Sequence, residues 1–405
     1  MSSCRALAVI DEGAIERNVA RLRRELAGET RMCAVVKADG YGHGALTAAR
    51  AALAGGADWL AVAGAAEAAE LRAGGIDGTP LLVMGALSEQ ERQIALGADA
   101  DVVVWREQDV AAVVRAGGGR VHVKLDTGMG RLGTRDAEQG RRVLEAAAAA
   151  DGVEIVGVMT HFATADDRDD GGFFDAQIER FSEWAAALKD ERPRLLAHAA
   201  NSAATLRDAR AHFDMVRCGI AIYGMDPFGV DPDAAELEPA LELRSYVAEV
   251  KRCAAGESVG YGRCFLAERD VEIAVLPIGY GDGWRRAVSA GCEVLIGGHR
   301  WPVVGAVSMD HLTVSLAAAA QRSLDPERLL GREAVLIGAQ GQARITAEEV
   351  AGHLATINYE VTCGITARVP RVPRRSREPT DGHASSDEPG REAAGSSSDT
   401  AEARR

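Results

Sequence analysis

Lysine is the scarcest charged residue in this chain of 405 residues, because only four of its 46 basic residues are lysines. Arginine replaces lysine wherever a surface cation is sufficient, but arginine cannot lose its proton or condense with an aldehyde. A lysine retained in such a chain is therefore a candidate for amine chemistry. The four lysines are Lys37, Lys124, Lys189 and Lys251.

Three further absences exclude whole classes of protein. The seven cysteines are scattered without a Cys-x-x-Cys pair, so neither a zinc site nor a dithiol redox centre is indicated, and we expect reduced thiols. No apolar run is long enough to span a bilayer, and the N-terminus lacks a secretory signal pattern. The net charge of −14 argues against a nucleic-acid or anionic-membrane partner. We expect a cytoplasmic protein with small-molecule ligands and no metal.

Eight short apolar runs mark the first half of the chain, and alanine-rich stretches with helical spacing separate them. The runs are 32–36, 59–63, 81–85, 102–105, 121–125, 155–159, 195–199 and 215–218. This alternation is typical of parallel β-α units. Eight units predict a closed (β/α)8 barrel of the TIM type, and a doubly wound open sheet is the alternative. Before the first run, apolar residues at helical spacing from Ile15 to Leu26 predict a helix capped by Asp11.

The pattern changes after Pro239, where β-branched and apolar runs alternate with glycine turns. These runs are 246–250, 271–276, 293–296 and 301–307, and a helical stretch follows at 346–355. We therefore predict a barrel domain over residues 1–240 and a mainly β domain over 241–372. Residues 373–405 contain no large hydrophobic side chain, so burial cannot offset the entropy of ordering them, and we expect a disordered tail.

Chemically distinctive residues follow several of the predicted barrel strands, at the C-terminal ends where barrel enzymes carry their chemistry. They are Lys37 after the first strand, Arg131 after the fifth, His161 after the sixth, Asn201 and Ser202 after the seventh, and Arg217, Gly219 and Ile220 at the eighth. The loops after the last two strands commonly bind phosphate through backbone N–H groups. A phosphorylated aldehyde cofactor would suit a lysine that faces such a phosphate-binding site.

The residues around Lys37 resemble the pyridoxal-phosphate attachment motif of the alanine racemase family. Residues 34–44 read Ala-Val-Val-Lys-Ala-Asp-Gly-Tyr-Gly-His-Gly, and the likeness covers roughly residues 5–372. Other segments that resemble the family are 124–133, 160–163, 200–202, 217–220, 259–262, 308–310 and 356–360. Agreement at so many separate segments makes a chance match implausible.

This resemblance implies an enzyme that interconverts L- and D-alanine with pyridoxal 5'-phosphate, supplying D-alanine for peptidoglycan. It implies that Lys37 holds the cofactor through a C=N link and acts as one of two acid–base groups. Tyr261 would be the other, because inversion at Cα removes a proton from one face and returns one to the opposite face. In the family this tyrosine comes from the partner subunit, so we expect a homodimer with shared active sites.

The resemblance also assigns binding roles. The cofactor-binding set is Lys37, Tyr41, His161, Asn201, Ser202, Arg217, Gly219, Ile220 and Tyr359. Arg217 would face the pyridine nitrogen, and His161 would link it to Tyr261. The substrate-binding set is Arg131, Met309 of the partner subunit and Tyr280, with Arg131 and the Met309 N–H holding the carboxylate. Lys124, which is carbamylated in some relatives, and Asp310 would support this set.

The chain departs from the family pattern at a few positions, and other functions stay open. Ser308 stands where the family often has Cys, and Gly281 and Trp284 stand where Ala and Tyr are common. The alternatives are a serine or broad-spectrum amino-acid racemase, a non-catalytic barrel protein that carries pyridoxal phosphate, and a barrel decarboxylase. The resemblance implies a narrow entrance formed by Tyr280 and Tyr359, which would favour alanine.

Overall fold

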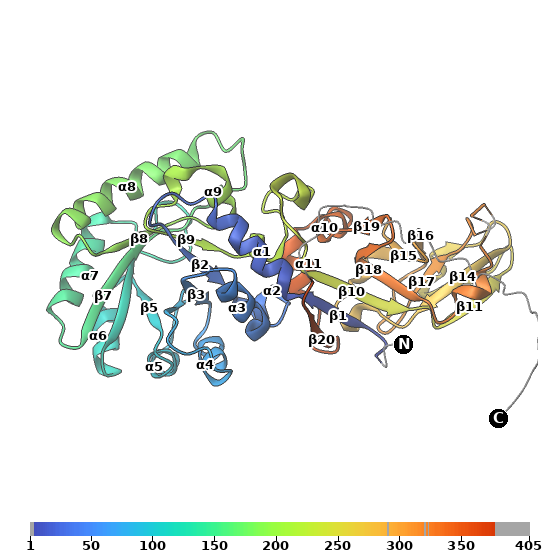
Figure 1. Cartoon of the computed structure of the whole chain (residues 1–405), viewed down its shortest axis with the longest axis horizontal. Helices are drawn as coiled ribbons and strands as arrows, with labels where there is room; N and C mark the ends of the chain where they lie inside the picture. The colour runs from blue at the N-terminus through green and yellow to red at the C-terminus, as the bar shows by residue number, and fades with distance from the viewer. Residues whose placement is uncertain (1–3, 290, 320, 323, 377–405) are drawn as a thin grey trace, which may run out of the picture.

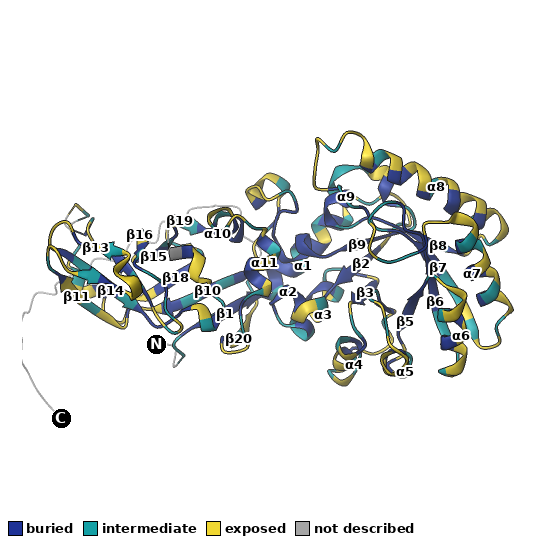
Figure 2. Ribbon diagram, turned by 180° about the vertical axis from the view of Figure 1, so that it is seen from behind, coloured by how far each residue is buried: buried dark blue, intermediate teal, exposed yellow. Residues whose placement is uncertain are grey.

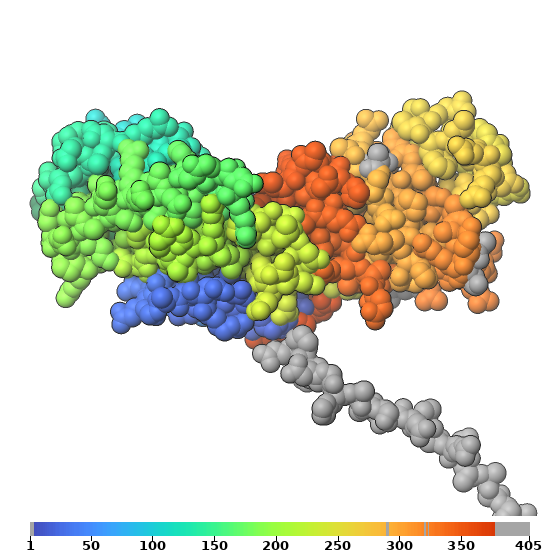
Figure 3. Space-filling view, turned by 90° about the horizontal axis from the view of Figure 1, so that it is seen from above, coloured from blue at the N-terminus to red at the C-terminus, as the bar shows by residue number. Residues whose placement is uncertain are grey.

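The computed structural model describes residues 4–289, 291–319, 321–322 and 324–376 (Figure 1). The molecule is elongated, with a helix-covered barrel at one end and a β-rich part at the other. In the space-filling view, the segment that follows residue 340 lies between these two parts (Figure 3). None of the helices in the described ranges is long and apolar enough to cross a membrane.

Eight parallel strands close into a barrel in which β2 pairs with β9. They are β2 (Arg31–Val35), β3 (Trp59–Val62), β4 (Leu81–Val83), β5 (Asp101–Val104), β6 (Gly119–Lys124), β7 (Val153–Met159), β8 (Leu196–His198) and β9 (Met215–Cys218). All eight predicted strands are confirmed. A doubly wound sheet is excluded because an open sheet has two unpaired edges, whereas this one has none.

Helices cover the outside of the barrel, with their buried faces turned toward the strands (Figure 2). They include α1 (Glu12–Arg23), α3 (Ala45–Ala54), α4 (Ala65–Ala73), α5 (Glu89–Gly97), α6 (Glu107–Arg115), α7 (Ala137–Ala149), α8 (Phe173–Glu191) and α9 (Ser202–Arg207). The predicted cap of α1 is confirmed, since the Asp11 carboxylate accepts a hydrogen bond from the Ala14 N–H at 3.2 Å.

The second part is built on a long sheet with the order β11-β14-β17-β16-β15-β18-β10-β1-β20, and β19 pairs with β18. Its strands are β1 (Leu7–Asp11), β10 (Leu241–Tyr246), β11 (Glu249–Cys253), β14 (Val271–Leu276), β15 (Glu293–Ile296), β16 (His299–Val304), β17 (Leu312–Ser315), β18 (Glu333–Gln340), β19 (Ala343–Ile345) and β20 (Arg371–Arg374). A separate hairpin joins β12 (Ser258–Val259) to β13 (Phe265–Leu266). Two helices, α10 (Ala347–Leu354) and α11 (Asn358–Cys363), lie between β19 and β20 in the sequence.

Three details of this sheet differ from the sequence expectations. The run 246–250 is not one strand, because the chain leaves β10 after Tyr246 and begins β11 at Glu249. β1 precedes the barrel in sequence but pairs with β10 and β20, so it belongs to the long sheet of the β-rich part and not to the barrel. The predicted tail begins too early, since β20 continues to Arg374 and the Ser376 N–H donates to Asp11. The rest of that tail, 377–405, lies outside the described residues.

Candidate active site

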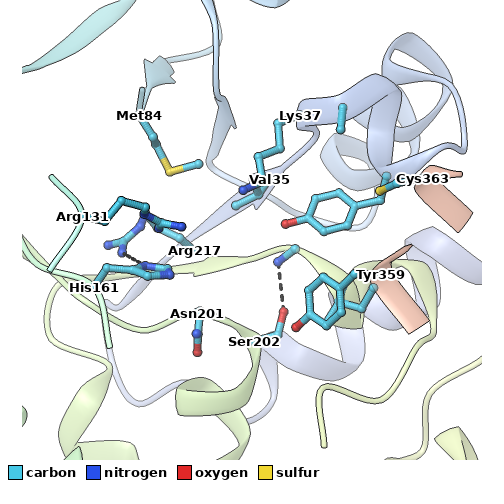
Figure 4. Close-up of a pocket in the computed structure, with 14 residues that line it drawn as sticks. Val35, Lys37, Met84, Arg131, His161, Asn201, Ser202, Arg217, Tyr359 and Cys363 are labelled. Carbon is cyan, nitrogen blue, oxygen red and sulfur yellow. Dashed lines mark hydrogen bonds between the residues drawn. The ribbon is translucent and has the colours of Figure 1, made fainter. Parts of the chain in front are cut away.

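A cavity of about 260 Å³ lies at the C-terminal ends of the barrel strands (Figure 4). Its lining includes ten residues predicted from the sequence: Lys37, Tyr41, Arg131, His161, Asn201, Ser202, Arg217, Gly219, Ile220 and Tyr359. Sequence reasoning missed the other four, which are Val35, Ala38, Met84 and Cys363. Val35 and Ala38 flank the motif lysine and were within reach of prediction. Met84 and Cys363 carry no chemical pattern, so only the fold identifies them.

Lys37 lies at the start of a left-handed turn that the glycine-rich motif makes possible. Residues 38–41 all have positive φ values, between 52° and 61°. A left-handed turn costs roughly 1–2 kcal/mol for each residue with a Cβ atom, so neighbouring groups must hold it in place. The Gly40 N–H donates to the Val36 carbonyl at 3.0 Å, which ties the turn to the end of β2.

Side chains on both sides of the turn supply this support. His43 is buried, and its Nδ1 lies 3.1 Å from the Gly40 carbonyl oxygen and 3.0 Å from that of Tyr41. Burial lowers the pKa of His43 to about 4, so its ring is neutral and one N–H serves these two acceptors. On the other side, the Glu67 carboxylate accepts a hydrogen bond from the Ala38 N–H at 2.6 Å. The turn therefore fixes where Lys37 leaves the backbone.

The surroundings of the Lys37 amine favour its uncharged form. Burial lowers its pKa below the ordinary range, and the positive charge of Arg131 lowers it further. Its Nζ lies 5.9 Å from the centroid of the Tyr41 ring. A lowered pKa increases the fraction of unprotonated amine, which is the form that condenses with an aldehyde and accepts protons.

Arg217 is buried beneath the cavity and donates only to uncharged acceptors. Its Nη2 donates to the Thr160 carbonyl at 2.8 Å, to the Ala199 carbonyl at 2.9 Å and to His161 Nδ1 at 3.2 Å. Its Nη1 donates to His198 Nδ1 at 2.9 Å. Burial lowers the pKa of Arg217 to about 10, so it is still a cation at neutral pH. The predicted contact between Arg217 and His161 is present.

His161 is neutral in this arrangement. Burial lowers its pKa well below the ordinary value, and the charges of Arg217 and Lys124 act in the same direction. Because Nδ1 accepts from Arg217, the ring proton is on Nε2. Lys124 itself does not line the cavity but is buried close by, and burial lowers its pKa to about 8.

Small residues form the opposite wall of the cavity, where the sequence predicts phosphate binding. The Ser202 hydroxyl accepts hydrogen bonds from the Gly219 N–H at 3.0 Å and the Ala221 N–H at 3.3 Å. Asn201 caps α9 by accepting from the Ala204 N–H at 2.9 Å. A Cβ atom on Gly219 would lie only 2.3 Å from the Tyr41 hydroxyl, so any larger residue here would displace the Tyr41 ring.

The cavity is cationic although the whole chain is acidic. Its lining contributes Lys37, Arg131 and Arg217 but no carboxylate. Within the described residues, no acceptor pairs with Arg131. Figure 4 shows Arg131, His161 and Arg217 gathered on one side, with Tyr359 and Cys363 on the other. Such a lining suits a ligand that carries a phosphate or a carboxylate group.

The remaining predicted residues lie on the β-rich part and do not line the cavity. Tyr261 starts a short turn between β12 and β13 and is 73% exposed, and Tyr280 and Met309 are 42% and 51% exposed. Tyr280 and Met309 lie on two joined loops, because the Tyr280 N–H donates to the Ser308 carbonyl at 3.0 Å. Asp310 pairs with Arg368 at 2.6 Å. Within one chain, the structure separates these residues from Lys37.

One departure from the family pattern, Gly281, lies close to two side chains in this structure. A Cβ atom on Gly281 would lie 2.1 Å from Nη1 of Arg368 and 3.1 Å from Cγ of Met309. The Arg368 side chain therefore occupies the space that an alanine methyl would need. Burial of the neighbouring Trp284 adds to the close packing behind these loops.

Together, the barrel, its lysine and the cationic wall define a barrel protein with a site for an anionic, amine-reactive ligand, joined to a second β-rich part. Family models match both parts of the chain: the alanine racemase N-terminal domain over residues 10–227 and the alanine racemase C-terminal domain over residues 240–373. The chain therefore belongs to the alanine racemase family.

Curated relatives and solved structures agree with this assignment. The alanine racemase of Symbiobacterium thermophilum is 42% identical over 373 residues, which cover 90% of this chain and 96% of the relative. Alanine racemase 1 of Bacillus subtilis is 40% identical over 90% of this chain and 92% of its own length. The crystal structure of alanine racemase from E. faecalis is 36% identical, with a TM-score of 0.84, and covers 92% of this chain and 98% of that chain. The Bacillus anthracis alanine racemase with bound L-Ala-P is also 36% identical, with a TM-score of 0.83, over 93% and 96% of the two chains.

Proposed function

We propose that this protein interconverts L- and D-alanine with pyridoxal 5'-phosphate, as a homodimer whose active sites are shared between subunits. The observation that carries the proposal is the position of Lys37, whose amine has a lowered pKa and lies in a cationic cavity that contains no carboxylate. A role in D-alanine supply for peptidoglycan and a cytoplasmic location are part of the same proposal.

The residues present suit the proposed cofactor. An aldehyde needs an unprotonated amine, and the lowered pKa of Lys37 increases the fraction in that form. A phosphate group needs small residues and donors, and across the cavity the Ser202 hydroxyl, which accepts from the Gly219 N–H, can still donate its own proton. Tyr41 and Tyr359 stand beside this wall, with ring centroids 6.0 Å apart. When bound, pyridoxal phosphate would withdraw electrons from the amino acid and so make its Cα hydrogen acidic.

Two groups on opposite faces of Cα would then exchange protons. The Lys37 amine would remove or return the proton on one face, and the phenol of the partner subunit's Tyr261 would do so on the other. This division explains why Tyr261 lies on an exposed turn outside the cavity of its own chain. His161 has its proton on Nε2, so it can donate to that phenol while accepting from Arg217.

Arg217 and Arg131 would have separate tasks. Arg217, held by four uncharged acceptors, would present a fixed cation to the cofactor ring and limit how much negative charge the ring accepts. Arg131 pairs with no acceptor among the described residues, so its guanidinium is available for the substrate carboxylate. The Met309 N–H of the partner subunit would complete the carboxylate site.

The proposal is tested by incubating purified protein and pyridoxal phosphate with L-alanine and measuring D-alanine by chiral chromatography. We expect both enantiomers to reach equal amounts from either starting enantiomer. Faster turnover of serine or lysine than of alanine would favour a broad-spectrum racemase. Cofactor binding without exchange of the Cα proton in deuterated buffer would indicate a non-catalytic carrier, and release of carbon dioxide would indicate a decarboxylase.

A further inference from the structure

A chain of buried hydrogen bonds leads from Arg217 through the interior of the barrel, away from the cavity. Arg217 Nη1 donates to His198 Nδ1 at 2.9 Å, and His198 Nε2 lies 2.9 Å from His122 Nδ1. His122 Nε2 lies 3.0 Å from Oδ2 of Asp101, the first residue of β5. These four side chains are between 0 and 3% exposed. They connect the chemistry-bearing end of the barrel to its opposite end.

The chemistry of Arg217 fixes the direction of every bond in this chain. A guanidinium can only donate, so His198 Nδ1 must accept. Burial and the charge of Arg217 lower the pKa of His198 well below its ordinary value, so the ring is neutral and its proton is on Nε2. His122 must then accept from His198 at Nδ1 and donate from Nε2. Asp101 must therefore be the acceptor at the end of the series.

Asp101 meets this requirement from the far end. Its Oδ1 accepts a hydrogen bond from Arg120 Nε at 2.6 Å, which leaves Oδ2 to accept from His122. Arg120 also pairs with Asp99 at 2.8 Å, near the surface. Arg217 and Arg120, which can only donate, stand at the two ends, and Asp101 can only accept. Together they permit a single arrangement of protons on His198 and His122.

The intervening strand is shaped to let the chain pass. His122 lies on β6 and His198 on β8, so their hydrogen bond passes over β7, the strand between them. Gly157 of β7 pairs with His122, and a Cβ atom there would lie 2.5 Å from the Leu196 carbonyl oxygen of β8 and 2.8 Å from His122 Nδ1. This nitrogen is the one that faces His198. Glycine at this position keeps the space around the bond between the two histidines open.

We propose that Asp101, His122 and His198 are positioning residues that orient the Arg217 guanidinium and couple the Asp101 charge to it across the barrel. In this arrangement Arg217 has a negative partner only at a distance, through two neutral imidazoles, and keeps its full positive charge toward the cavity. The role of the oriented Arg217 rests on the proposed function, whereas the proton arrangement does not.

The first test reads the proton positions directly in the wild-type holoenzyme. In protein labelled with ¹⁵N at histidine, NMR distinguishes protonated from unprotonated ring nitrogens. We expect both His122 and His198 to carry their proton on Nε2. A proton on Nδ1 of either ring, or a doubly protonated ring, would overturn the proposal whether or not the protein racemises alanine.

The second test reverses the chain by the substitution Asp101→Asn. An asparagine side chain has one oxygen acceptor, which would accept the hydrogen bond from Arg120. Its NH₂ group would then donate to His122 Nε2, so the His122 proton would move to Nδ1. His198 then presents an N–H to Arg217, and that hydrogen bond is lost. We expect Nδ1 protonation in both rings and about a tenfold lower kcat, with KM for alanine changed less than about twofold.

Two further variants separate this effect from a loss of stability. His212→Asn removes another buried imidazole, which is not part of the hydrogen-bonded series from Arg217 to Asp101 and whose Nε2 contacts the Thr205 carbonyl. This variant should lower thermal stability without changing the His122 and His198 tautomers or kcat. Gly157→Ala should disturb the bond between the two histidines and reproduce the loss of kcat, together with a loss of thermal stability because its Cβ would also meet the Leu196 carbonyl oxygen. Unchanged tautomers in Asp101→Asn, or an equal loss of kcat in His212→Asn, would refute the proposal. Wild-type protein with the expected tautomers but no racemisation would refute the proposed function alone.

Discussion

Lys37 lines the barrel cavity, whereas Tyr261 lies on a turn of the β-rich part, 73% exposed and outside the lining of that cavity. A two-base reaction that uses both residues therefore needs two copies of the chain. The exposed positions of Tyr280 and Met309 on the same part are consistent with this requirement, since both are assigned to the same substrate site.

Mixed dimers give the sharpest test of a shared site. Lys37→Arg and Tyr261→Phe should each be nearly inactive, but unfolding and refolding them together would form hybrids with one intact site. Random pairing makes half of the dimers hybrid, so we expect about a quarter of the wild-type racemase activity. If each site used residues of one chain only, the mixture would have no more activity than its components.

The two substitutions should also differ in their spectra. Lys37→Arg removes the condensing amine, so the visible absorbance of the imine should disappear after addition of pyridoxal phosphate. Tyr261→Phe should keep this absorbance and lower kcat at least about a hundredfold, as expected for loss of an acid–base group. Full activity of Tyr261→Phe in both directions would show that the assignment of the second base is wrong.

Lys124 should make stability depend on pH in an unusual direction. Its folded pKa of about 8 lies below the ordinary 10.5, so between these values the unfolded chain binds a proton that the folded protein does not. This residue therefore makes the free energy of unfolding rise with pH across that window. Lys124→Met should be more stable than wild type by up to ~3 kcal/mol below pH 8, and the advantage should shrink toward pH 10.5. Urea denaturation in buffers free of carbon dioxide measures it; a constant difference from pH 7 to 10 would contradict the prediction.

Gly219→Ala tests the phosphate-binding wall. The added Cβ would lie 2.3 Å from the Tyr41 hydroxyl, so Tyr41 must move, and we expect at least about tenfold weaker binding of pyridoxal phosphate. The matched control is Gly64→Ala, because a Cβ atom there meets nothing within 4 Å. Equal cofactor affinity of the two variants, measured by fluorescence titration, would show that the wall does not hold the phosphate group.

The sequence by itself determined the barrel strands, the capped first helix and most of the cavity lining. These follow from local information: alternating patterns define strand and helix, and strand ends in a parallel barrel necessarily meet at one end. For this reason Lys37, His161 and Arg217 could be placed together before any contact between them was known.

Only the tertiary structure decided which distant segments become neighbours. β1 pairs with β10 and β20, hundreds of residues away, and Cys363 reaches the cavity from the last helix. The buried chain from Arg217 to Asp101 likewise joins side chains of four strands and passes beside Gly157. No local pattern encodes such contacts, because they depend on strand register and on the direction in which each side chain points when the barrel closes.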